Sequence, residues 1–146
     1  MNFRDANEFD YDFVKNLHHL TLKEYIEPIW GWDETEQDQA LRKWFNPAKV
    51  KIIQDINKEI GIVVVIHRQK DIFFESISII PGYQKQGLGT KIIKNIIDEA
   101  KKKQMPIVLQ VLKTNHKAKK LYERLGFKVY DDKNEHFYLK LDLPEA

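Results

Sequence analysis

The stretch Tyr83–Thr90 reads YQKQGLGT and joins two apolar runs, FFESISII at residues 73–80 and KIIKNIIDEA at residues 91–100. The first run is typical of a buried strand, and helical spacing of isoleucines in the second predicts a helix. Two glycines at this junction let the backbone bend tightly and let an anion approach the unpaired N–H groups of the helix. Lys85 adds a positive charge. The stretch fits a cradle for phosphate or pyrophosphate, and it fits equally well a turn whose glycines satisfy backbone geometry only.

Two better-known phosphate motifs do not fit this junction. A Walker loop that starts at Gly82 would need a lysine after Gly87, where the chain has Leu88. A dinucleotide fingerprint that starts at Gly87 would need a third glycine at the position of Ile92. Neither nucleotide hydrolysis nor nicotinamide binding is supported.

The elements on either side of this stretch predict a mixed sheet covered by helices. Apolar spacing favours helices over residues 10–27, where Pro28 should end the first, then from Asp33 or Thr35 to about Phe45, and over 87–103 and 117–125. Runs rich in Ile, Val and Phe favour strands over residues 51–56, 60–67, 71–80, 107–112, 127–130 and 136–143. The first three should form an antiparallel meander with turns at Asn57-Lys58 and Gln69-Lys70. No linker divides the chain, so residues 1–146 are expected to form one domain.

Composition excludes several classes of function. The 146 residues contain no cysteine, which excludes disulfides, thiolate metal sites and an acyl-cysteine intermediate. The net charge of +2, with both signs mixed, argues against nucleic-acid binding. No apolar run is long enough to span a membrane, the polar N-terminus is not a signal peptide, and no His/Asp/Glu spacing suggests a metal site. A cytoplasmic protein with no membrane partner is therefore expected.

A second motif follows about thirty residues later, in VLKTNHKAKKLYERLGF at residues 111–127. Asn115 lies between a predicted strand and a short helix, where it can act as the N-cap. Tyr122 lies on the apolar face of that helix and can simply pack in the core. Gly126 is placed to end the helix.

Together the two motifs resemble a known family. Gln84-x-x-Gly87-x-Gly89 after a strand, followed by Asn115-x-x-Ala118-x-x-Leu121-Tyr122-Glu123-Arg124-x-Gly126-Phe127, is similar to the acetyl-CoA-binding core of the GNAT superfamily of N-acetyltransferases. The resemblance covers residues 51–143 well. It implies an α/β fold in which a mostly antiparallel sheet, splayed between two strands, is flanked by about four helices.

The resemblance also implies a binding site for acetyl-CoA. The pantetheine arm would lie in the gap between strands 77–80 and 107–111, paired with backbone near Ile79 and hydrogen-bonded by Asn115. Backbone N–H groups of Lys85–Thr90 would hold the pyrophosphate, and the lysine-rich helix from Lys117 would flank the cofactor. The implied cofactor-binding residues are Ile79, Gln84, Lys85, Gln86, Gly87, Leu88, Gly89, Thr90, Asn115 and Lys119.

Two residues are candidates for catalysis under this resemblance. Tyr122 would donate a proton to the leaving CoA thiolate, or only hydrogen-bond its sulfur. Glu75 interrupts an apolar strand, where a carboxylate is costly unless it faces a cleft or a partner. It is therefore the candidate base, and an ion pair with a neighbouring Lys or Arg is the alternative. His136, Glu24 and Glu27 are further candidates for the base.

An acceptor pocket is expected near the first helices and the last strands. Trp30 and Trp32 would wall a small amine there or, as the alternative, staple two helices. Glu24 and Glu27 make this region acidic, which suits a cationic acceptor, although a solvated helix face explains them equally well. The candidate acceptor-binding residues are Glu24, Glu27, Trp30, Trp32 and His136.

The predicted activity is transfer of an acetyl group to a primary amine of a small molecule, by direct attack in a ternary complex because the chain has no cysteine. One alternative is acetylation of a protein N-terminus or lysine. An alternative of another class is a CoA-binding sensor or interaction module without turnover. Because relatives are often dimers, the resemblance also allows a homodimer.

Overall fold

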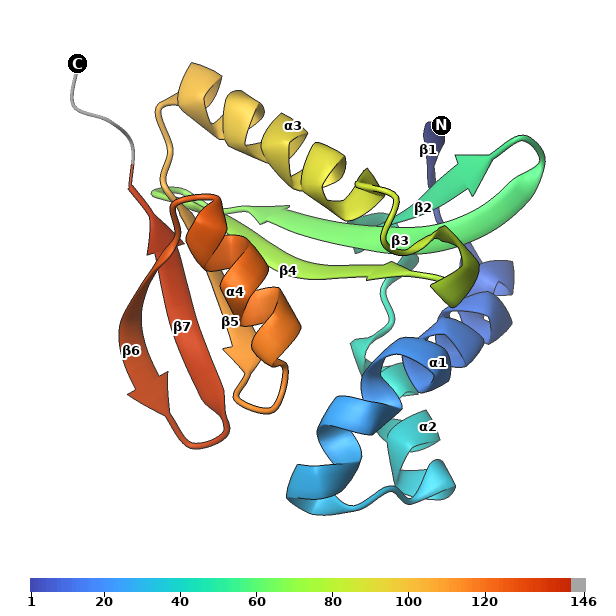
Figure 1. The fold of residues 1–146 in the computed structure, drawn as a ribbon. Coiled ribbons are helices and arrows are strands. Elements are labelled where there is room, and N and C mark those ends of the chain that lie inside the picture. The colour runs from blue at the N-terminus through green and yellow to red at the C-terminus, as the bar shows by residue number, and fades with distance from the viewer. Residues whose placement is uncertain (143–146) are drawn as a thin grey trace. The chain divides into compact units, whose positions relative to one another are not determined.

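The computed structural model describes residues 1–142. Within them, seven strands form a sheet in the order β1-β2-β3-β4-β5-β7-β6, and four α-helices connect them (Figure 1). The predicted mixed sheet with about four helices is confirmed. Leu143, the end of the last predicted strand, lies outside the described residues. The elements are β1 Asn2–Asp5, α1 Tyr11–Trp30, α2 Glu34–Trp44, β2 Val50–Asp55, β3 Lys58–His67, β4 Ile72–Ile79, α3 Leu88–Lys103, β5 Ile107–Leu112, α4 His116–Arg124, β6 Lys128–Lys133 and β7 His136–Leu141.

The chain divides into two compact units. The first contains residues 1–65 and 76–86, and the second contains residues 66–75 and those from Gly87 onward. Strand β4 gives its first half to the second unit and its second half to the first unit. The expectation of one domain over residues 1–146 stays a prediction.

Strands β1, β2 and β3 of the first unit pair antiparallel. Ile52 and Ile53 of β2 are both fully buried, so side chains on both faces of this strand are covered. The turn between β2 and β3 lies at Ile56-Asn57, one residue earlier than predicted, and both residues have positive φ angles of 38° and 62°. That conformation suits a tight two-residue hairpin. On β3, a Cβ at Gly61 would lie 2.3 Å from the carbonyl oxygen of Ser78, so this close approach requires glycine.

The first helix corrects one prediction. α1 continues through Pro28 to Trp30, and it ends at Gly31 (φ 72°), whose N–H donates to the carbonyl of Glu27 at 2.9 Å. Pro28 removes one intrahelical hydrogen bond, the one that its N–H would donate to the carbonyl of Glu24, and α1 ends two residues after it. Glu24 is exposed, so water can satisfy that carbonyl. The next helix, α2, is capped by Asp33, which accepts from the N–H of Glu36 at 2.9 Å.

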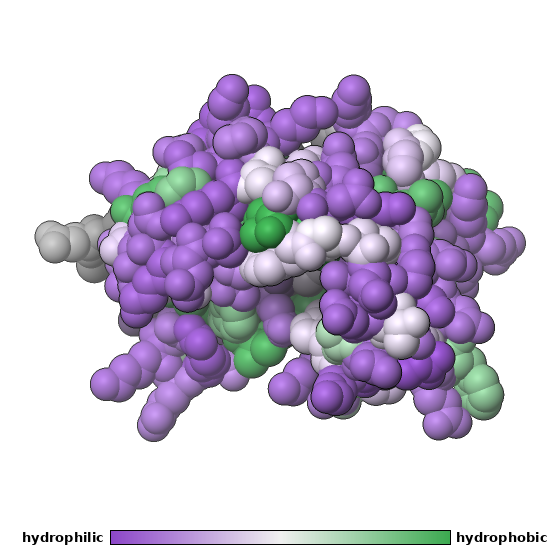
Figure 2. Space-filling view, turned by 90° about the horizontal axis from the view of Figure 1, so that it is seen from below, coloured by the Kyte–Doolittle hydropathy of each residue, from purple (hydrophilic) through white to green (hydrophobic). Residues whose placement is uncertain are grey.

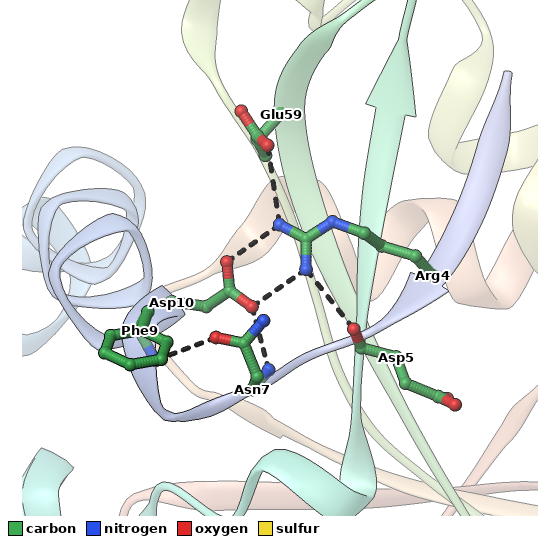
Figure 3. A network of polar contacts seen from close by, with 6 residues as sticks. All are labelled: Arg4, Asp5, Asn7, Phe9, Asp10 and Glu59. Carbon is green, nitrogen blue, oxygen red and sulfur yellow. Dashed lines mark hydrogen bonds and ion pairs between the residues drawn. The ribbon is translucent and has the colours of Figure 1, made fainter.

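A polar network fastens the start of α1 to the sheet of the first unit (Figure 3). The guanidinium of Arg4 on β1 donates to both carboxylate oxygens of Asp10, at 2.9 and 2.8 Å. Asp10 also accepts from the backbone N–H of Asn7 at 2.8 Å, and Arg4 reaches Glu59 of β3 at 3.4 Å. The hydrogen bond from Arg4 is the main reason why the pKa of Asp10 lies below its ordinary value. No sequence motif predicted this network.

In the second unit, β4 pairs in parallel with β5 over Ile72–Phe74 and Ile107–Leu109. β5 then pairs antiparallel with β7, and β7 with β6. The predicted apolar stripe of α3 also included Leu88, which is partly buried; its other members are buried, namely Ile92, Ile93, Ile96, Ile97 and Ala100.

Candidate active site

The loop before α3 has the backbone of an anion cradle. Lys85 and Gly87 have positive φ angles of 63° and 77°, separated by Gln86. Left-handed residues in such an alternation turn successive N–H groups toward one concave side. A Cβ at Gly87 would meet nothing within 4 Å, so the space beside this glycine is open. The loop residues from Gln84 to Gly87 are exposed.

The helix that follows leaves its first N–H groups available. The first hydrogen bond in α3 runs from the N–H of Lys91 to the carbonyl of Gly87, at 3.0 Å. No side chain of residues 1–142 caps this helix, and its first turn carries no acidic residue. The N–H groups of Leu88, Gly89 and Thr90 therefore point out of the positive end of a sixteen-residue helix. These groups fit a pyrophosphate.

The two glutamines brace this loop. The side-chain amide of Gln84 donates to the carbonyl of Ile79 at 2.8 Å, and that of Gln86 donates to the carbonyl of Gly82 at 3.1 Å. Ile79 is the last residue of β4, so Gln84 ties the loop to the end of that strand. These bonds give both side chains a local structural role, which the sequence motif did not reveal.

At the start of α4, Asn115 acts as the N-cap. Its side-chain oxygen accepts from the N–H of Ala118 at 3.1 Å, which leaves the side-chain NH₂ without a hydrogen-bond partner among the described residues. Asn115 can therefore cap the helix and still donate to a ligand. Lys119 pairs with Glu123 at 3.1 Å, and its ammonium group lies 5.0 Å from the ring centre of Phe137.

Tyr122 of α4 is buried, with 8% of its surface exposed. Burial alone raises the pKa of its phenol to about 12, so the hydroxyl keeps its proton at neutral pH. No residue in the described part of the chain hydrogen-bonds this hydroxyl. Within that part, every side-chain nitrogen or oxygen that is fully enclosed has a hydrogen-bond partner, so the Tyr122 oxygen is not one of the fully enclosed atoms. The hydroxyl oxygen therefore remains accessible at the surface of the second unit. The ring of Tyr122 therefore packs in the core while its hydroxyl stays available to a ligand.

Glu75 belongs to the second unit and follows Phe74, the last residue of β4 that pairs with β5. It is partly buried, as are its same-face neighbours Phe73 and Ile77. On this face the guanidinium of Arg68 lies 5.0 Å from the ring centre of Phe73, and Arg68 is ion-paired with Asp71.

Among the candidate acceptor residues in the first unit, Trp32 packs against two histidines of α1. Its indole N–H donates to Glu34 at 2.8 Å, and its ring centre lies 5.8 and 5.3 Å from those of His18 and His19. These contacts suit the staple that was the alternative to a pocket wall. Trp30 is instead 58% exposed.

The acidic candidates lie on exposed positions of α1. Both Glu24 and Glu27 are exposed, and Glu27 lies 4.0 Å from Lys23. In the second unit His136 is half-buried on β7, where burial lowers the pKa of its imidazole. A lowered pKa keeps this ring neutral at physiological pH and able to accept a proton.

Residues 1–142 contain no group of three or more His, Cys, Asp or Glu side chains arranged to hold a metal ion. No helix within this range is long and apolar enough to cross a membrane. Most residues on the face drawn in Figure 2 are hydrophilic, and the apolar ones form small separate groups.

Comparison with known proteins identifies a family for this chain. A family model described as the acetyltransferase (GNAT) family matches residues 15–127. Mouse thialysine N-ε-acetyltransferase is 41% identical over 119 residues, which cover 79% of this chain and 70% of the mouse protein. The ribosomal protein bS18-alanine N-acetyltransferase of Escherichia coli K12 is 42% identical over 53 residues, 36% of each chain. Fission yeast (Schizosaccharomyces pombe) N-alpha-acetyltransferase 30 is 26% identical over 125 residues, 82% of this chain and 80% of that protein.

Solved structures show the same fold. The PaiA N-acetyltransferase of Thermoplasma acidophilum, in complex with coenzyme A, superposes with a TM-score of 0.78 at 16% identity, covering 97% of this chain and 98% of that one. The fold and the family match together confirm the resemblance found from the two motifs. The chain therefore belongs to the acetyltransferase (GNAT) family, whose members take their acetyl group from acetyl-CoA.

Proposed function

We propose that this chain transfers an acetyl group from acetyl-CoA to the primary amine of a small molecule, by direct attack in a ternary complex. The observation that carries the proposal is the uncapped start of α3. Its three free N–H groups follow a glycine with open space beside it. In this assignment the backbone from Lys85 to Thr90 holds the pyrophosphate, and the NH₂ of Asn115 donates to the pantetheine arm.

In this assignment the side chains of the loop do not bind the pyrophosphate themselves; they support the backbone that does. Gln84 and Gln86 keep the backbone in shape through their bonds to Ile79 and Gly82. Lys85 adds a positive charge at the loop. Lys119 adds another on the helix that flanks the cofactor.

The chain's own groups then handle two protons. The amine nitrogen forms a bond to the thioester carbonyl carbon as the carbon–sulfur bond breaks, and a thiolate leaves. Tyr122, whose phenol is protonated at neutral pH, donates its proton to that sulfur. The protonated amine loses two protons in all. Glu75 accepts the first before attack and passes it to solvent. The second, lost from the nitrogen after attack, reprotonates the Tyr122 phenolate, so the products are the amide, the free thiol and one released proton.

The acceptor class rests on two supports. The relative that shares 41% identity over 79% of this chain is named for the ε-amine of thialysine, a small amino acid. Such an amine has a pKa near 10.4, so deprotonating it at pH 7.5 costs about 4 kcal/mol. A base such as Glu75 is therefore needed more than for an α-amine. The acidic side chains of Glu24 and Glu27 suit a cationic acceptor.

A second candidate is acetylation of a protein N-terminus. It is favoured by the relatives named for the alanine of ribosomal protein bS18 and for N-alpha-acetylation. The first of these matches only about a third of either chain, and the second is 26% identical. Both support this candidate less than the mouse relative supports the first. The other alternative, a CoA-binding module without turnover, is opposed by an intact Tyr122.

The test begins with calorimetric titration of acetyl-CoA into the protein and its Gly87→Glu variant. Glutamate at this left-handed position strains the turn and repels the pyrophosphate, so saturable binding should be lost. Asn95→Glu is the matched control, because it adds the same charge to an exposed position of α3 outside the loop. Absence of binding to the unaltered protein at millimolar acetyl-CoA would refute the proposal.

Acceptors are then compared by thiol release, which has no background because the chain lacks cysteine. Thialysine and lysine are set against a peptide that begins with alanine. Turnover with the small amines supports the proposal, and turnover with the peptide alone supports the second candidate. Binding without turnover on any amine supports the sensor.

A further inference from the structure

The ring of Tyr122 is enclosed by two aromatic rings of the second unit. Its centre lies 5.7 Å from that of Phe127, at an interplanar angle of 64°, and 6.2 Å from that of Phe74, at 69°. Both are edge-to-face contacts, the geometry that aromatic quadrupoles favour. Phe127 and Phe74 are each only 2% exposed, so neither ring moves easily. Because no hydrogen bond within the described chain holds the Tyr122 hydroxyl, ring packing is what orients it.

The contact with Phe127 is built into the end of α4. The N–H of Phe127 donates to the carbonyl of Tyr122 at 3.0 Å, and the N–H of Gly126 donates to the carbonyl of Glu123 at 3.1 Å. With Gly126 at φ 102°, these two bonds form a Schellman motif. The motif brings the residue after the glycine back onto the third residue before the cap. Here those two residues are Phe127 and Tyr122.

Gly126 cannot be replaced without disturbing this arrangement. Its left-handed conformation disfavours any side chain, and a Cβ there would also approach Leu141 to 3.2 Å. Phe127 therefore holds Tyr122 twice, by the backbone bond to its carbonyl and by the ring contact. The glycine makes both contacts possible.

We infer that Phe127 is a positioning residue for acetyl transfer: through the Schellman motif of α4 it fixes the direction in which the Tyr122 hydroxyl points. The inference deepens the proposed function and rests on the role of Tyr122 there as proton donor. Proton transfer needs the donor at hydrogen-bond distance from the leaving sulfur, so a small rotation of the ring removes catalysis without removing binding.

The first test is the Phe127→Leu variant, which keeps the backbone bond and an apolar side chain but removes the ring. Its kcat should fall by about ten- to a hundredfold, because a misplacement of about 1 Å is costly, while the KM for acetyl-CoA stays within about twofold. Ile52→Val, a substitution in the buried β2 strand of the first unit, serves as the control for general loss of packing. In a Tyr122→Phe background, Phe127→Leu should lower kcat no further. An equal loss in both backgrounds would show that Phe127 acts elsewhere.

The second test does not depend on activity. Among six tyrosines, the ring signals of Tyr122 are assigned in NMR spectra by their loss in Tyr122→Phe. In Phe127→Leu these signals should shift, because a neighbouring ring current is gone, and ring flipping should become faster. Unchanged Tyr122 signals would overturn the inference. Wild-type turnover in Tyr122→Phe would remove the proton-donor role instead, and the spectra would still report whether Phe127 orients the ring.

Discussion

The side-chain amide of Gln84 donates a 2.8 Å hydrogen bond to the carbonyl of Ile79, at the end of β4. Replacing this donor in Gln84→Leu should loosen the loop that precedes α3 and reduce the calorimetric affinity for acetyl-CoA by about fivefold, since a typical hydrogen bond contributes about 1 kcal/mol. The melting temperature should change little because Gln84 is exposed. Gln39→Leu, at another exposed position, should keep full affinity. Equal affinity of the two variants would exclude the bracing role.

Two glycines of the first unit should respond in opposite ways to alanine. In Gly61→Ala the new Cβ would meet the Ser78 carbonyl at 2.3 Å, so backbone must shift, and we expect a loss of about 3 kcal/mol in the free energy of unfolding. Gly82 has open space around it and an ordinary φ, so Gly82→Ala should be neutral or stabilising by up to about 1 kcal/mol. Urea midpoints at constant m-value measure both. A stable Gly61→Ala protein would mean that β3 and β4 do not approach as described.

Local patterns predicted most elements because they depend on spacing along the chain. The isoleucine stripe of α3, the strand at Ile107–Leu112 and the cap at Asn115 lie where periodicity and capping chemistry placed them. The error at Pro28 arose because a proline two residues before a helix end removes a single hydrogen bond, to an exposed residue, and the helix continues through it.

Contacts between residues whose spacing matches no helix or strand period escaped prediction for a different reason. The Arg4–Asp10 pair and the packing of Trp32 on His18 and His19 join residues whose separations follow no period. The contact of Phe127 with Tyr122 could have been predicted, since a glycine just after a helix, here Gly126, is typical of a Schellman motif. The base and the acceptor residues remain predictions because their roles depend on the bound substrates.

Acid stability should depend on the pair of Arg4 and Asp10. Because the folded-state pKa of Asp10 lies below its ordinary value of 3.8, the unfolded chain binds the proton more tightly than the folded chain does. The stabilisation is therefore complete above the unfolded value and is lost as the pH falls through the lower folded value. Asp10→Asn should cost about 1–3 kcal/mol at pH 7, because it leaves Arg4 without its carboxylate, and less near pH 3. Asp5→Asn, at an exposed ion pair, is the control. A penalty for Asp10→Asn that stays constant between pH 7 and pH 3 would contradict this account.

The two candidate bases are separated by paired variants. Glu75→Gln should lower kcat for a lysine-like amine by about a hundredfold or more, as loss of a general base does. His136→Gln should then have a small effect, and His67→Gln, at an exposed position on β3, should have none. If His136 is the base, the order reverses. In that case kcat should decrease on the acidic side with a midpoint below pH 6.5, because the pKa of His136 is lowered from that value.

The alkaline side of the rate profile tests Tyr122. With a pKa of about 12 its phenol stays protonated where an ordinary tyrosine ionises. At pH 10 it is only about 1% ionised, whereas a phenol with a pKa of 10 would be half ionised. The wild-type kcat should therefore show no decline up to pH 10, and Tyr122→Phe should lower kcat by about a hundredfold with an unchanged KM for acetyl-CoA.

The same phenol should affect stability at high pH. A folded-state pKa above the unfolded value of 10 gives stability that is complete below pH 10 and is lost as the pH rises toward 12. Tyr122→Phe removes the phenol that ionises, and with it this pH-dependent contribution to stability. The urea midpoint of unfolding of the variant should therefore fall less steeply above pH 10 than that of the wild type. The absorbance of phenolate at high pH, compared between the two proteins, reports the ionisation directly. A Tyr122 that ionises near pH 10 would show that its phenol is not desolvated, and the predicted alkaline profile would have to be abandoned.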